Sequence, residues 1–262
     1  MKIIDLHSHI YPDQIARKAA QSVKDFYDGL GDLSMDGTES MLMERGKQAG
    51  IDKFVVLPVA IRPDRVGSIN NFIFQRAREN DSLIPFGTVH AEMDGLTDEV
   101  ERLIGLGMKG IKMHPDSQRF PIDDPRLFPM YEAVKGRIPV MLHMGDQRYD
   151  YSHPARLRRI LELFPELEVI AAHFGGFTMQ ETAREYLQDT SCVMDISSAA
   201  RFMEPGVAEK YINLYGAERI AFGSDYPMFD PLEEVGNFLK LKLTHEQREQ
   251  IAHKTAERVL KL

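Results

Sequence analysis

The sequence predicts a (β/α)8 (TIM) barrel, on two observations. Short apolar runs rich in Val, Ile and Phe alternate with longer amphipathic stretches along the whole chain. There are eight such runs in 262 residues, which is the size of a closed eight-stranded barrel. An open, doubly wound sheet is the alternative, but no Gly-x-Gly-x-x-Gly motif follows an early strand. Because no low-complexity segment or linker divides the chain, we expect one domain over residues 1–262.

The predicted strands are the apolar runs at 2–9, 53–60, 83–90, 109–114, 138–144, 167–174, 192–198 and 219–225. Helices are predicted where apolar residues recur every three to four positions. These ranges are Thr38–Gln48, Asn70–Glu79, Thr97–Leu106, Pro125–Lys135, Pro154–Phe164, Met179–Gln188 and Gly206–Tyr215. A last amphipathic helix is predicted over Thr244–Leu262, with Thr244 as its N-cap. Strands that alternate with helices in this way are typical of a parallel sheet covered by helices.

The segment Phe26–Gly37 departs from this pattern, because Gly and Asp are dense in it. It follows the first strand, so in a barrel it would lie at the face that carries active sites. We expect it to be either a lid over that face or a plain surface loop.

Composition excludes several classes of protein. A net charge of −8 disfavours nucleic acid or an anionic membrane as the main partner. No apolar run approaches the ~20 residues that span a bilayer, and the N-terminus lacks the pattern of a signal peptide. The single cysteine, Cys192, excludes an internal disulfide framework and is expected to be a buried strand residue. Together these features predict a cytoplasmic protein.

Polar side chains of the metal-ligand type stand where the predicted strands end. His7 and His9 are two residues apart on the first strand, so their side chains point the same way. The later strands end in His90, His114, His143, His173 and Asp225. Because the carboxyl ends of barrel strands gather at one face, these groups are expected to converge there. The sequence therefore predicts a metal site at the barrel mouth.

The motifs that contain these residues resemble those of the amidohydrolase superfamily, in the branch that includes aminocarboxymuconate-semialdehyde decarboxylase and many hydrolases. They are Asp5-Leu6-His7-Ser8-His9, Gly110-Ile111-Lys112-Met113-His114-Pro115, Val140-Met141-Leu142-His143, Ala172-His173-Phe174-Gly175-Gly176 and Phe222-Gly223-Ser224-Asp225-Tyr226-Pro227. The resemblance covers the whole chain in order. It implies a barrel of the metallo-dependent hydrolase type.

The resemblance implies one divalent metal ion held by His7, His9, His143 and Asp225, with His173 beside it as general base or electrophile. Asp225 would be both a ligand and a proton acceptor. Three imidazoles and a carboxylate suit Zn²⁺, and Mn²⁺ or Fe²⁺ are the alternatives. Zinc lowers the pKa of bound water toward neutrality, and imidazole exchanges protons in the same pH range.

Four further residues are predicted to contact substrate: Lys112, His114, Arg62 and Arg148. Lys112 is also the position at which two-metal members of the superfamily carry a carboxylated lysine, but the local motif resembles the single-metal branch. Arginines in the loops after strands suit a carboxylate or phosphate on a small, acidic substrate.

The leading functional hypothesis is a metal-dependent hydrolase acting on a small, anionic, carbonyl-containing molecule. The alternative is non-oxidative decarboxylation of an aromatic or unsaturated carboxylic acid at the same site. The third hypothesis, a metal-binding barrel without catalysis, is disfavoured because every expected ligand is present. The resemblance also implies a homodimer, since family members often form dimers.

Overall fold

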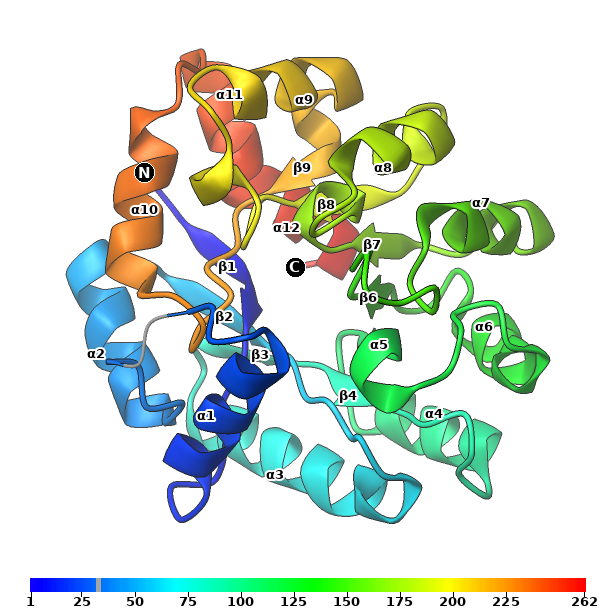
Figure 1. Ribbon diagram of the computed structural model, residues 1–262. Coiled ribbons are helices and arrows are strands. Elements are labelled where there is room, and N and C mark those ends of the chain that lie inside the picture. Colours follow the sequence, from blue (N-terminus) through cyan, green and yellow to red (C-terminus); the bar gives the residue numbers. More distant parts are fainter. Residues whose placement is uncertain (32–33) are drawn as a thin grey trace.

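The computed structural model describes residues 1–31 and 34–262, and its parallel strands form a barrel surrounded by helices (Figure 1). The (β/α)8 prediction is confirmed. Residues 32–33 of the predicted loop Phe26–Gly37 lie outside the described residues.

All eight predicted strands are present in the described chain, each shorter than its apolar run. Their bounds are β1 Ile4–Ser8, β2 Lys53–Val56, β3 Leu83–Pro85, β4 Gly87–Thr88, β5 Ile111–Met113, β6 Val140–Leu142, β7 Val169–Ala171, β8 Val193–Asp195 and β9 Ile220–Ala221. The predicted strand 83–90 is divided into β3, which pairs with β2, and β4, which pairs with β5. The division falls at Phe86, whose N–H donates to Val56 O (3.2 Å), while that of Gly87 donates to Gly110 O (2.9 Å).

The barrel closes between its first and last strands. The Leu6 N–H donates to the Phe222 carbonyl (2.9 Å), and the Asp225 N–H donates to the His7 carbonyl (2.7 Å). A further bond joins the His9 N–H to the Tyr226 carbonyl (2.7 Å). The alternative of an open sheet is therefore wrong, and closure places the first and last sequence motifs side by side.

The predicted helices are present with shifts of a few residues at their ends. They are α2 Glu39–Ala49, α3 Val66–Glu79, α4 Leu96–Gly105, α6 Phe128–Val134, α7 Pro154–Leu163, α8 Gln180–Leu187 and α9 Val207–Tyr215. The C-terminal helix is interrupted: α11 His245–Glu249 and α12 Thr255–Leu260 are joined by a π-helical turn. Thr244 and Gln247 form the capping box at its start. None of the described helices is both long and apolar enough to cross a membrane.

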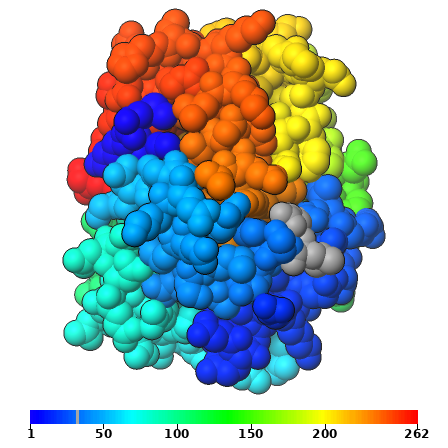
Figure 2. Space-filling model, turned by 90° about the vertical axis from the view of Figure 1, so that its left-hand side faces the viewer, coloured from blue at the N-terminus to red at the C-terminus, as the bar shows by residue number. Residues whose placement is uncertain are grey.

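Three α-helices of the described residues were not predicted: α1 Ala16–Phe26, the one-turn α5 Pro115–Gln118 and α10 Pro231–Lys240. The helices α2 and α10 pack side by side on one face of the molecule (Figure 2). There the Arg45 guanidinium donates to Asp230, the N-cap of α10 (Nε to Oδ1, 3.0 Å). This contact joins α2, which follows the first strand, to α10, which follows the last strand, on the outer surface of the barrel.

Apolar side chains fill the barrel away from the strand ends. Ile4 of β1, Met141 of β6 and Ile170 of β7 belong to one buried cluster with Val259 and Leu260 of α12. The C-terminal helix therefore covers that end of the barrel. The polar side chains lie at the carboxyl ends of the strands, where helix caps and loops can surround a site.

Candidate metal centre

The predicted ligands lie together at the carboxyl ends of the strands. His7 belongs to β1 and His9 follows it, while His143, His173 and Asp225 follow β6, β7 and β9. The His7 Nε2 lies 3.3 Å from Asp225 Oδ1, and the His9 Nε2 lies 3.6 Å from the same oxygen. The His173 Nε2 is 3.1 Å from His143 Nδ1. Ligands of one metal ion are separated by about this much when each is ~2.0–2.2 Å from the ion.

A glycine allows the close approach of the first and last strands at this point. A Cβ added at Gly223 would lie 2.9 Å from His7 Cβ and 3.2 Å from Ser197 Cβ. Only Gly lets the segment that leads from β9 to Asp225 pass so close to His7.

Hydrogen bonds fix the tautomers of three histidines. The Nδ1 of His7 lies 3.0 Å from Asp195 Oδ2, that of His9 is 2.6 Å from the Leu57 carbonyl, and that of His173 is 2.8 Å from the Ser197 carbonyl. An oxygen acceptor at each Nδ1 requires the proton there, so each neutral ring keeps a lone pair on Nε2. This is the arrangement by which proteins orient histidines toward a metal ion.

Electrostatics keeps His7, His143 and Asp225 in their metal-binding forms. Burial, aided by Lys112, holds the pKa of His7 well below its usual range, and burial beside His114 does the same to the pKa of His143. Burial alone would raise the pKa of Asp225, but His7 and the other nearby imidazoles bring it below its ordinary value. Neutral imidazoles and an ionised carboxylate are the groups that a divalent cation needs.

The ligand atoms around His143 and His173 fall into two groups. Two sets of ligand atoms each lie within 4.8 Å of one another: His7, His173 and Asp225 in one, and His114, Asp116 and His143 in the other. The His143 ring stacks on His114 with centroids 4.0 Å apart. His173 thus lies with two predicted ligands. His143 belongs to the second set, and its Nδ1 lies 3.1 Å from the His173 Nε2 of the first. Their separate roles stay predictions.

Lys112 and His114 both face this cluster. The Lys112 Nζ lies 3.3 Å from His7 Nε2, and burial lowers the pKa of this lysine to about 8. The His114 Nε2 lies 2.7 Å from the Tyr27 hydroxyl, which is also 3.3 Å from His143 Nε2. Both residues are placed where they could contact a substrate at the barrel mouth.

The two arginines predicted to bind substrate are engaged elsewhere. The Arg62 side chain is 63% exposed and pairs with Asp64 at 2.9 Å. Arg148 pairs with Asp146 at 2.7 Å, and its Nη1 donates to the Phe26 carbonyl at 2.6 Å. It therefore ties the end of α1 to the loop after β6. Their substrate contacts stay predictions.

Sequence reasoning missed Asp195 and Tyr27. Asp195 ends β8, so the same strand-end rule that selected the histidines would have found it. Tyr27 follows α1, a helix that was not predicted, and it had no motif of its own.

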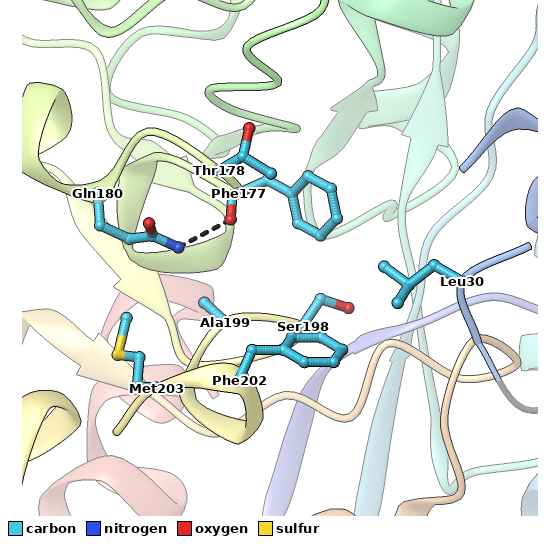
Figure 3. Close-up of a pocket in the computed structure, with 8 residues that line it drawn as sticks. All are labelled: Leu30, Phe177, Thr178, Gln180, Ser198, Ala199, Phe202 and Met203. Carbon is cyan, nitrogen blue, oxygen red and sulfur yellow. Dashed lines mark hydrogen bonds between the residues drawn. The ribbon is translucent and has the colours of Figure 1, made fainter. Parts of the chain in front are cut away.

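A cavity of about 340 Å³ adjoins the centre (Figure 3). It lies between the loops after β7 and β8 and the segment after α1, and its lining comprises Leu30, Phe177, Thr178, Gln180, Ser198, Ala199, Phe202 and Met203. Ser198 connects it to the centre, because its hydroxyl donates to Asp225 Oδ2. The Phe177 ring lies 5.7 Å from the His173 ring, centroid to centroid.

Solved structures share this fold at low sequence identity. An uncharacterized TIM-barrel protein from Bordetella bronchiseptica is 22% identical with a TM-score of 0.82, over 100% of this chain and 99% of that one. The 5-carboxyvanillate decarboxylase from Sphingomonas paucimobilis is 15% identical with a TM-score of 0.78, over 100% and 99%. A dihydroxybenzoic acid decarboxylase from Polaromonas sp. JS666, solved with manganese and an inhibitor, is 16% identical with a TM-score of 0.77, over 100% and 97%.

The resemblance read from the motifs extends over nearly the whole sequence. The family model described as amidohydrolase matches residues 4–262. This match includes every predicted ligand, from His7 to Asp225. The chain therefore belongs to the amidohydrolase family of enzymes.

Proposed function

We propose that this enzyme is a metal-dependent decarboxylase that releases carbon dioxide non-oxidatively from a small aromatic or unsaturated carboxylic acid. The observation that carries the proposal is the juxtaposition of oriented imidazole Nε2 atoms and the Asp225 carboxylate with an aromatic-lined cavity. The two decarboxylases described above, which share the fold, support it.

The proposed metal ligands are His7, His9, His143 and Asp225, with His173 as the group that carries a proton. A bound divalent cation would act as a Lewis acid on substrate oxygens. The donor set suits Zn²⁺, and Mn²⁺, which the Polaromonas enzyme binds, is the alternative.

The reaction exchanges a carboxylate for a proton at the same carbon. The bond from that carbon to the carboxyl group breaks, carbon dioxide leaves, and the carbon takes up one proton. His173 can hold that proton on Nε2, because its Nδ1–H donates to the Ser197 carbonyl (2.8 Å). Lys112, whose pKa of about 8 leaves it mostly charged at neutral pH, would attract the substrate carboxylate toward His7.

Hydrolysis is the second candidate, and the ionised state of Asp225 favours it. Its Oδ1 lies within 3.6 Å of the Nε2 atoms of His7 and His9. A carboxylate there can accept a proton from water as the water attacks a carbonyl carbon.

An assay of products separates the two candidates. The protein, prepared with Zn²⁺ or Mn²⁺, would be incubated with hydroxybenzoates and unsaturated carboxylic acids and, separately, with carboxylic esters, amides and lactones. Carbon dioxide release with loss of the carboxyl group supports decarboxylation. Cleavage of an ester, amide or lactone without carbon dioxide supports hydrolysis instead, and failure to bind either metal would refute both.

Two matched variants test the roles of His143 and His173. His143→Ala should lose bound metal and activity together, whereas His173→Ala should keep most of its metal and lose turnover. Metal content by atomic emission and turnover would be measured on the same preparations. If His173→Ala loses its metal and His143→Ala keeps it, His173 is the ligand and His143 carries the proton. The grouping of His173 with His7 and Asp225 would agree with that result.

A further inference from the structure

We infer that the cavity beside the centre binds an uncharged apolar part of the substrate, of about one ring, and rejects a substrate with a second anionic group there. The inference rests on the proposed function only in placing the reacting carboxylate at the metal centre. It adds the substrate class and the residues that select it.

The described residues that line the cavity carry no charge. None of its eight described residues is ionisable, and Leu30, Phe177 and Phe202 surround its space (Figure 3). Its volume of about 340 Å³ is near the lower end of ligand pockets, which begin at ~300 Å³. Such a space suits a small apolar group.

The polar lining residues are already engaged with the protein. The Gln180 Nε2 donates to the Phe177 carbonyl (2.8 Å), and the Ser198 hydroxyl donates to Asp225. The Thr178 hydroxyl donates to the Gly145 carbonyl (3.3 Å). A charged group that entered would lose water, and the two hydroxyl hydrogens and one amide hydrogen named here would already be donated to the protein, so the loss is costly.

The arginine beside the cavity is also engaged with other residues. Arg201 directly precedes Phe202, but its Nη1 lies 2.8 Å from Glu234 Oε1. Its guanidinium carbon lies 4.0 Å from the centroid of the Phe229 ring. Because the guanidinium already contacts the Glu234 side chain and the Phe229 ring, it is not placed to pair with an anion in the cavity.

Two phenylalanines mark the ends of the cavity. Phe177 lies at the metal end, with its ring centroid 5.8 Å from that of His143 and 5.2 Å from that of Tyr27. Phe202 lies at the rim, since it is 55% exposed. A substrate ring or alkyl group between them would be desolvated on both sides, so the Phe202 side chain should set the preference for apolar substituents.

Binding of inert probes tests this inference without catalysis. Calorimetry on the Zn²⁺-loaded protein would compare benzoate, 4-isopropylbenzoate and terephthalate, which carries a second carboxylate at the same ring position. We expect 4-isopropylbenzoate to bind about tenfold more tightly than benzoate, as expected for added carbon atoms in an apolar pocket, and terephthalate to bind more weakly than benzoate.

Variants at the rim assign the effect to the cavity. Phe202→Ala should remove the advantage of 4-isopropylbenzoate and Phe202→Leu should restore most of it. Leu239→Ala, which truncates a 50% exposed side chain on α10, is the matched control and should change nothing. Met203→Arg, at a half-buried residue of the lining, should improve terephthalate binding by adding a cation.

Two results would overturn the inference: terephthalate binding as tightly as benzoate to the unaltered protein, or an unchanged preference for 4-isopropylbenzoate in Phe202→Ala. If the probes behave as expected but no acid is decarboxylated, the apolar cavity stands and the proposed reaction fails.

Discussion

Replacing Asp195 with Asn is expected to weaken metal binding about 10- to 100-fold, as do other changes to a group that orients a metal-binding histidine. Asp195 is fully buried, and its Oδ2 accepts the His7 Nδ1–H at 3.0 Å. Its Oδ1 accepts the backbone N–H of Ser197 (3.0 Å) and that of His173 (3.2 Å). Both oxygens therefore face donors.

An amide cannot satisfy both sides. With the NH₂ of the substituted side chain toward His7, two donors would face each other, the NH₂ and the Nδ1–H. The His7 ring would then have to move its proton to Nε2, and it would lose the lone pair that binds the metal. With its NH₂ turned away, it would face the two backbone N–H groups. A loss of 10- to 100-fold corresponds to about 1.4 to 2.8 kcal/mol of binding free energy.

Competition with a chromophoric chelator would measure the metal affinity of Asp195→Asn against the unaltered protein. The control is Asp123→Asn, which also replaces a buried carboxylate, one that pairs with Arg156 at 2.6 Å. Circular dichroism would establish that each variant is folded. An Asp195→Asn protein that is folded and binds metal as tightly as the unaltered protein would refute the orienting role of Asp195.

Three further outcomes are expected. Removing the metal with a chelator should lower the melting temperature by roughly 5–10 °C, because a ligand at 100 times its Kd stabilises the folded protein by about 2.7 kcal/mol. An unchanged melting temperature would argue against a metal site in the native fold. Gly223→Ala should destabilise the protein by about 1–3 kcal/mol and weaken metal binding, because the added Cβ would lie 2.9 Å from that of His7. Gly67→Ala, with open space around its Cβ, is the control and should change neither quantity in denaturant and metal titrations. The Cys192 thiol should resist a disulfide reagent in the native protein and react after unfolding, because it is buried and burial raises its pKa; rapid native labelling would contradict this.

The strand-end rule explains how much of the site could be predicted. Hydrophobic periodicity locates strands, and in a parallel barrel the end of a strand determines the face on which its next residue lies. His7, His9, His173 and Asp225 were found in this way and do lie together. The rule says nothing of side-chain orientation, so it could not separate the role of His143 from that of His173.

Loops escaped prediction for a different reason. Arg148 follows a strand, as an anion-binding arginine would, yet it binds Asp146 and the Phe26 carbonyl. Its partner Phe26 is the last residue of α1, whose position over the mouth depends on packing and on no local pattern. The cavity near Phe177 and Phe202 is likewise built from two loops and a segment far apart in the sequence.

The sequence by itself determined the barrel and the kinds of ligand at its mouth, because both follow from local periodicity and from residue chemistry. The tertiary structure decided which nitrogen of each histidine is available, because the oxygen that fixes it comes from a distant strand or loop. Asp195, for example, is 188 positions from His7. Closure of β1 against β9 and the apolar cavity beside Asp225 are likewise properties of chain packing, which no single segment encodes.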